Sequence, residues 1–125
     1  MIEVHNATIE STRLEVEDHG ILTAWINTRR ANSTVQGFGG FCFSGGRPTR
    51  FSPLLSEFIY HVTILWGQWE KLPGKPIRVL VKDQSIAALG HYIDDTFLGF
   101  RGDLFILADE AGWRTYFGTT HEDAG

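Results

Sequence analysis

The chain of 125 residues fits a single domain of ordinary size, which is long enough to bury a core without a metal or a disulfide. Its 42% apolar and 21% charged residues exclude a disordered tail and a supercharged surface. The net charge of −4 argues against a nucleic-acid binder, which needs a basic stripe, and is too weak for a mimic of a polyanion.

Cysteine usage and hydropathy indicate the compartment. Cys42 is the only cysteine, so no intramolecular disulfide can form and a reducing cytosol fits best. The N-terminal residues have neither the basic nor the apolar region of a signal peptide. Apolar runs stay short of the roughly 18 residues of a membrane helix. We therefore expect a cytoplasmic protein that does not contact a membrane.

The N-terminal third has the pattern of strands. Leu14 and Val16 alternate with polar neighbours, residues 18–20 have turn composition, and residues 21–27 resume a β-favouring run. This pattern predicts a hairpin. A polar loop at residues 29–34 separates it from a third extended run at residues 35–43, which three glycines interrupt.

One helix is predicted over residues 53–66. Ser52 can act as its N-cap, Pro53 suits the first helical position, and Gly67 is a natural stop. Apolar residues recur inside it at spacings of three and four and predict one buried stripe, formed by Leu55, Phe58, Ile59, Val62, Leu65 and Trp66.

The second half of the chain has weaker signals. A turn at residues 72–76, a strand at 77–82, a turn at 83–85 and a returning strand at 86–93 predict a second hairpin. A last strand is expected at residues 104–107 and a turn at 109–112. Residues 1–118 are then one domain, and residues 119–125 a frayed C-terminal tail.

This order of elements predicts an α+β fold, a twisted and mostly antiparallel sheet with one main helix packed on one face. A single helix cannot cover both faces of a sheet. The other face needs a long loop, the C-terminal segment or a second subunit, so we expect a homodimer or a higher homo-oligomer.

Four residues are candidates for acid–base or metal chemistry. Asp18 and His19 are adjacent, although turn chemistry is the favoured explanation of both, because adjacent residues on a strand point to opposite faces. His61 lies four residues after Glu57 on the predicted helix, a spacing that suits either two metal ligands or an ordinary surface pair. His91 follows Gly90 in the second hairpin. Nothing in the spacing brings these groups together, and we expect no metal and no cofactor.

A phosphate-binding alternative combines aromatic and basic residues. The string at residues 36–41 is neither a dinucleotide fingerprint nor a Walker loop, and its glycines indicate either a bent strand or close approach of a ligand. In the second case Phe38 or Phe41 would be a stacking platform. Arg47 and Arg50 precede the predicted helix start, where N–H groups and the helix dipole favour an anion.

Several blocks resemble a family of small uncharacterised phage and prophage proteins. They are EDHGILT at residues 17–23, QGFGG at 36–40, LPGKPIRV at 72–79 and LGH at 89–91. The resemblance covers roughly residues 2 to 98. It implies a viral setting and the cytoplasm of a bacterial host, and it brings no catalytic residue and no cofactor.

These observations favour a phage-encoded, non-enzymatic binding protein with a counter-defence role. It would inhibit a host defence protein or sequester a phosphate-bearing nucleotide signal, with Phe38, Phe41, Arg47 and Arg50 as the ligand-binding residues. Two alternatives stay open. One is a small phage hydrolase or metal-dependent enzyme that uses Asp18, His19, His61 or His91, and the other is a structural protein-contact module.

Overall fold

The computed structural model describes residues 2–16, 22–42, 54–101 and 104–124, without the side chains of residues 40–42, 54, 104 and 119–124. These residues form one antiparallel sheet and two helices, which confirms the predicted α+β fold. The strands are β1 (Ile2–Val16), β2 (Leu22–Arg30), β3 (Val35–Cys42), β4 (Pro76–Lys82), β5 (Ser85–Gly90), β6 (Phe97–Arg101) and β7 (Leu104–Ala108). The helices are α1 (Leu54–Trp66) and α2 (Glu110–Ala124), with a 3-10 turn, η1 (Trp69–Lys71), between α1 and β4.

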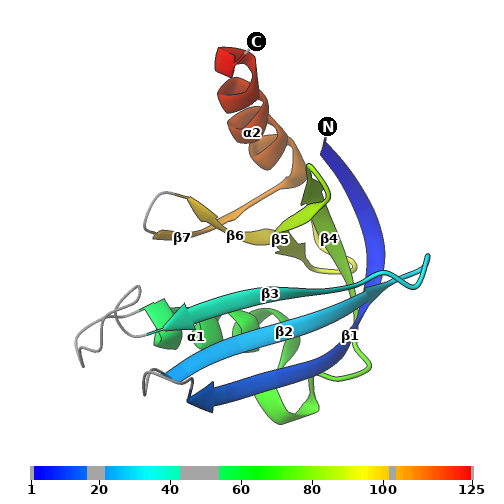
Figure 1. Cartoon of the computed structure of the whole chain (residues 1–125), viewed down its shortest axis with the longest axis vertical. Coiled ribbons are helices and arrows are strands. Elements are labelled where there is room, and N and C mark those ends of the chain that lie inside the picture. Colours follow the sequence, from blue (N-terminus) through cyan, green and yellow to red (C-terminus); the bar gives the residue numbers. More distant parts are fainter. Residues whose placement is uncertain (1, 17–21, 43–53, 102–103, 125) are drawn as a thin grey trace.

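The long strand β1 joins the two halves of the sheet. The strand order is β3-β2-β1-β4-β5-β6-β7, so β1 pairs with β2 on one side and with β4 on the other. Ala7 and Thr8 lie where both pairings overlap, and a bulge follows between Ile9 and Ser11. The N-terminal part of β1 therefore belongs to the half with β4–β7, and its C-terminal part to the half with β2 and β3 (Figure 1).

Helix α1 packs its predicted stripe into the main core. Phe58 is fully buried and lies 6.0 Å from Phe38 of β3 and 5.8 Å from Phe105 of β7, measured between ring centroids. One helix thus contacts residues from both ends of the strand order. The helix ends as predicted, because Gly67 adopts a φ of 101° and its N–H bonds the carbonyl of Thr63. The predicted cap residues 52 and 53 lie outside the described residues.

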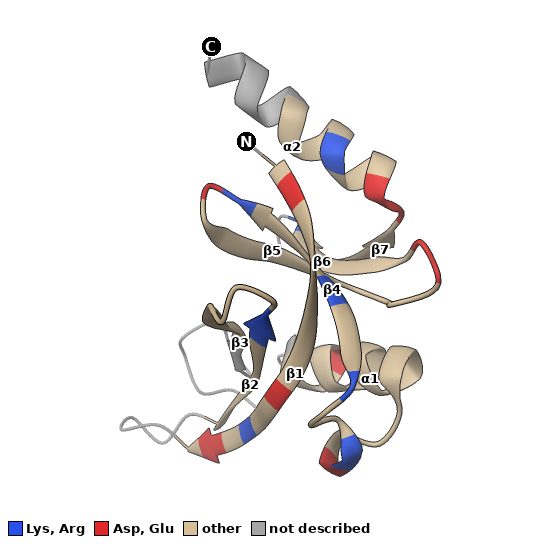
Figure 2. Ribbon diagram, turned by 90° about the vertical axis from the view of Figure 1, so that its right-hand side faces the viewer, with Lys and Arg blue, Asp and Glu red and all other residues tan. Residues whose placement is uncertain are grey.

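Helix α2 was not predicted; it extends away from the end of β7 (Figures 1 and 2), and Trp113, Tyr116 and Phe117 near its start pack on the other face of the β4–β7 half. The turn expected at residues 109–112 is wrong. The side chain of Asp109 accepts a hydrogen bond of 2.7 Å from the N–H of Gly112, which makes Asp109 the N-cap of a helix. The start of the C-terminal helix thus buries part of the second sheet face. Neither described helix is long and apolar enough to cross a membrane.

Trp113 fixes α2 to the sheet. Its side chain is 1% exposed, its indole N–H donates a 2.9 Å hydrogen bond to the carbonyl of Phe97, and its ring stacks on Phe117. The ring lies so close to Gly99 that a Cβ there would come within 2.8 Å of it. Gly99 is therefore required by this contact, since any side chain would displace the indole.

Replacing Trp113 with Ala should lower the free energy of unfolding by about 3–5 kcal/mol, because a large ring and a buried hydrogen bond are lost together. Urea denaturation measures the change. The matched control is Thr115→Ala on the exposed side of α2, for which we expect a change within about 0.5 kcal/mol. Equal effects of the two substitutions would show that α2 does not depend on Trp113.

Candidate functional site

A cleft of about 430 Å³ lies at the end of β2, next to the last of the side chains that point toward the core from this strand. We call it the Arg30 cleft. It is bordered by the start of β1, the end of β2, the loop that follows β2 and the β4–β5 turn. The polar residues that line it are Glu3, His5, Arg30, Asn32, Asp83 and Gln84.

Strand alternation explains why these polar groups meet. Successive side chains of a strand point to opposite faces, so Arg30 shares the face of the buried residues Ile26 and Thr28. In the same way His5 shares the face of the buried Ala7 on β1. The apolar rows of two neighbouring strands thus continue into charged residues at one end of the core.

Arg30 is only partly satisfied in this cleft. One terminal N–H group donates to the Gln36 side chain at 2.9 Å, and the Gln36 amide donates in turn to the backbone carbonyl of Gln84 at 2.8 Å. The Nε of Arg30 is buried, and among the described residues it has no hydrogen-bond acceptor. A buried donor without an acceptor costs about 1–3 kcal/mol, or more when it is charged.

Acidic groups lie on the other side of the cleft. The carboxylate of Glu3 is 3.0 Å from Nε2 of His5, an interaction between residues two apart on one strand. The β4–β5 turn contributes Asp83 and Gln84, both with positive φ angles of 51° and 71°. Two consecutive positive φ angles fit the tight turn of a two-residue hairpin. The lining of the cleft therefore contains both hydrogen-bond donors and acceptors, and both positive and negative charges.

The sequence did not identify this site. His5 and Glu3 carried a readable signal, because residues two apart in a strand share a face. No local pattern pointed to Arg30, since its role depends on contacts with residues that are far away in the sequence. In Figure 2 acidic and basic segments occur in both halves of the described ribbon, so charge alone does not mark the cleft.

The predicted phosphate-binding residues are not brought together by the described part of the chain. Phe38 is 7% exposed and packs against Phe58 in the core, which leaves little of its ring to a ligand. Its strand, β3, lies at one end of the strand order, and its pairing with β2 shifts register between Ala24 and Trp25. The backbone of Phe41 pairs with Ala24, but its side chain is not described. Arg47 and Arg50 lie outside the described residues.

The predicted catalytic residues are likewise dispersed or undescribed. Asp18 and His19 lie outside the described residues. His61 is half-buried on α1, with its ring centroid 5.6 Å from Tyr60 and 6.3 Å from Phe105. Among the residues that are described, His, Cys, Asp and Glu form no group of three or more that could hold a metal.

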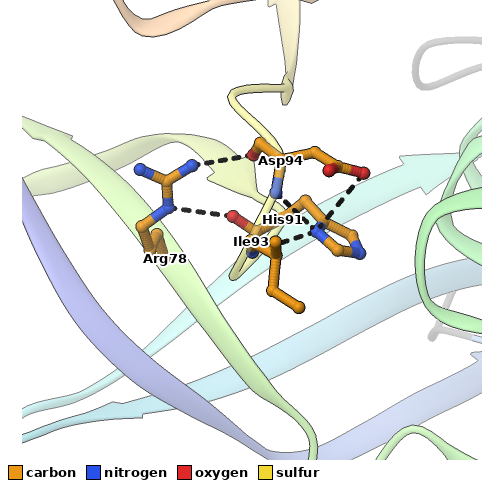
Figure 3. Close-up of polar contacts among 4 residues, drawn as sticks. All are labelled: Arg78, His91, Ile93 and Asp94. Atoms are coloured by element: carbon orange, nitrogen blue, oxygen red, sulfur yellow. Dashed lines mark hydrogen bonds and ion pairs between the residues drawn. The ribbon is translucent and has the colours of Figure 1, made fainter.

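His91 organises a loop (Figure 3). Its Nδ1 accepts hydrogen bonds from the backbone N–H groups of Ile93 and Asp94 at 3.1 and 3.0 Å. Since Nδ1 is an acceptor, the ring proton belongs on Nε2. Arg78 completes the arrangement by donating to the carbonyls of His91 and Asp94, both at 2.8 Å. The contacts of His91 are those of a residue that shapes the loop between β5 and β6.

Comparisons with protein-family models, with curated proteins and with solved structures gave no match. The functional argument therefore depends on the residues themselves. The Arg30 cleft combines a partly buried and partly bonded guanidinium, carboxylate and amide acceptors, and enough volume for a small molecule.

The role of His91 can be tested by removing its acceptor. In His91→Leu the amides of Ile93 and Asp94 lose their partner, and their hydrogen exchange should accelerate about fivefold, since one hydrogen bond contributes about 1 kcal/mol. In His91→Asn the side-chain oxygen takes the place of Nδ1, and exchange should stay near that of the parent protein. Amide exchange followed by NMR measures both, and equal acceleration in the two variants would contradict the assignment.

Proposed function

We propose that this protein is a non-enzymatic binding protein for a small phosphate-bearing ligand, and that the phosphate is held by Arg30. The observation that carries the proposal is the Arg30 guanidinium in the lining of the cleft, which is bonded to Gln36 through one terminal nitrogen and has a buried Nε without an acceptor among the described residues. A phosphate oxygen is a strong acceptor for a guanidinium, and its charge offsets that of a partly buried arginine. Gln36 holds the guanidinium from one side and so orients the remaining donor.

The other cleft residues suit the uncharged part of a nucleotide. Glu3 and Asp83 provide carboxylate oxygens and Asn32 a side-chain amide, which can accept hydrogen bonds from hydroxyl or amino groups of a ligand. The volume of about 430 Å³ lies within the range of small-molecule sites. A mononucleotide unit, with one phosphate and several hydroxyl and amino donors, matches this set better than inorganic phosphate alone.

The biological setting follows from the sequence resemblance. A small phage protein that binds a nucleotide in the bacterial cytoplasm would remove a defence signal from solution. This is the form of counter-defence that the Arg30 cleft supports. Inhibition of a host defence protein by direct contact, and catalysis involving Asp18, His19, His61 or His91, are the competing functions.

The test is titration calorimetry with the four ribonucleoside monophosphates and, as ligand controls, the matching nucleosides. At least one nucleotide should bind and its nucleoside should not. Arg30→Met should weaken binding by more than about tenfold, because a charged hydrogen bond is lost. The same variant should unfold at an equal or higher urea concentration, because the buried unpaired donor is removed. Arg29→Met is the matched control, since the Arg29 guanidinium is bound to Glu10.

Three outcomes would contradict the proposal. Nucleosides that bind as tightly as nucleotides would show that the phosphate is not recognised. Unchanged binding in Arg30→Met would place the ligand elsewhere. Conversion of a nucleotide to a product during the titration would establish an enzyme and favour the catalytic alternative.

We also propose that the protein self-associates. The supporting observation is not the uncovered sheet face that the sequence led us to expect. Because Trp113, Tyr116 and Phe117 of α2 already occupy part of the second face of the β4–β7 half, we do not propose a partner on that face. Support comes instead from α1, on which Tyr60 and Ile64 lie one turn apart and are 62% and 64% exposed. Two such surfaces could pack against each other around a twofold axis.

Light scattering at tens of micromolar should then give twice the mass of one chain. Ile64→Lys should reduce the mass to that of a monomer, because a charge would be buried in the interface. The control is Ile93→Lys, at an equally apolar residue that is 82% exposed in the β5–β6 loop, and it should leave the mass unchanged. A monomeric parent protein would contradict the proposal.

A further inference from the structure

A second cleft, of about 420 Å³, lies on the opposite face of the same part of the sheet. We call it the Tyr92 cleft, and the lining residues that matter here are Asn6, Thr8, Arg29, Ser33, Pro76 and Tyr92. Asn6 and Thr8 alternate with the buried Ala7 and Ile9, so their side chains point away from the main core. Arg30 borders both clefts, one on each face.

The floor of the Tyr92 cleft is the place where β1 is paired on both sides. Thr8 pairs with Arg29 of β2 and with Pro76 of β4, so these three residues form a row across three strands. Paired strands hold such a row at fixed spacing. The charge of Arg29 is largely offset within the floor, because its guanidinium bonds the carboxylate of Glu10.

Tyr92 lines one side of the cleft. It belongs to the β5–β6 loop, whose conformation is held by His91 and Arg78 (Figure 3). Besides the four hydrogen bonds that these two residues make, the N–H of His91 bonds the carbonyl of Thr96, and the N–H of Thr96 bonds the carbonyl of Asp94. Tyr92 sits inside this network and is nevertheless 48% exposed. An aromatic ring presented by a fixed loop loses little conformational entropy when a ligand covers it.

The facing wall is the loop between β2 and β3, and it is also fixed. The N–H of Ser33 bonds the carbonyl of Arg30, the N–H of Arg30 bonds the carbonyl of Thr34, and the Asn32 side chain accepts from the N–H of Thr34. Ser33 has a φ of 68°, a conformation that such a turn requires. Hydrogen bonds thus hold the backbone on both sides of the Tyr92 cleft and along its base.

We propose that the Tyr92 cleft binds a saccharide through one pyranose ring. A pyranose has an apolar face of C–H groups and a rim of hydroxyls that donate and accept hydrogen bonds. The cleft offers the half-exposed aromatic side chain of Tyr92 for the first, and the Asn6 amide and the Thr8 and Ser33 hydroxyls for the second. These neutral groups suit hydroxyls, and the two arginines of the lining already have side-chain partners, Glu10 for Arg29 and Gln36 for Arg30.

The saccharide proposal does not depend on the ligand of the Arg30 cleft. Saturation-transfer NMR tests it with methyl glycosides of glucose, galactose, mannose, rhamnose and N-acetylglucosamine as probes. At least one probe should receive saturation at its C–H protons, with an affinity in the millimolar range typical of a single ring on one aromatic wall. Tyr92→Ala should weaken that affinity by at least about tenfold, and Tyr92→Phe should keep it within about threefold, because only the ring face is required.

Ile93→Ala is the matched control, since Ile93 is the neighbouring exposed side chain and is not part of the cleft lining, and it should leave binding unchanged. Tyr92→Ala should retain the nucleotide response of the parent protein, which separates failure of this proposal from failure of the first. Absence of saturation transfer for all five glycosides would overturn the proposal. Transfer that persists at full strength in Tyr92→Ala would overturn it as well.

Discussion

The structure depends on the pairing of one strand on both of its sides. At Ala7 and Thr8 of β1 the ladders to β2 and to β4 overlap, and a bulge follows at once. The two halves of the sheet can therefore diverge without losing the hydrogen bonds that join them, since a bulge bends the strand that contains it. The main core, α1 and both clefts are all placed by this bend.

The same bend explains why polar groups collect where they do. Along β2 the interior face passes from apolar residues through Thr28 to Arg30, and along β1 it passes from Ala7 to His5. Each apolar row ends where the halves of the sheet separate and water can enter. A charge at that boundary is neither fully solvated nor fully paired, and this is the condition in which a ligand group contributes most. Arg30 occupies that boundary position. The stability of the fold does not require a charged side chain there.

Features set by local periodicity were predicted well, and features set by distant contacts were not. The stripe on α1 and its stop at Gly67 followed from spacing and turn chemistry. Helix α2 was missed because Gly112 near its start resembled a turn, although Trp113, Tyr116 and Phe117 already had helical spacing. The clefts depend on β1 meeting strands from both halves of the chain, a pairing that no local pattern encodes.

The double pairing of β1 also has a consequence for the order in which the chain acquires its structure. Glu3 pairs with Val81, so the N-terminal part of β1 emerges from the ribosome long before its partner strand exists. The β1–β2–β3 meander can form early, while the open edge of β1 waits for β4. Until then the nascent chain exposes a strand edge bearing Val4 and Ala7, and the neighbouring polar residues Glu3, His5 and Asn6 keep that edge from attracting other chains. Residues that later line the clefts thus protect the chain during its synthesis.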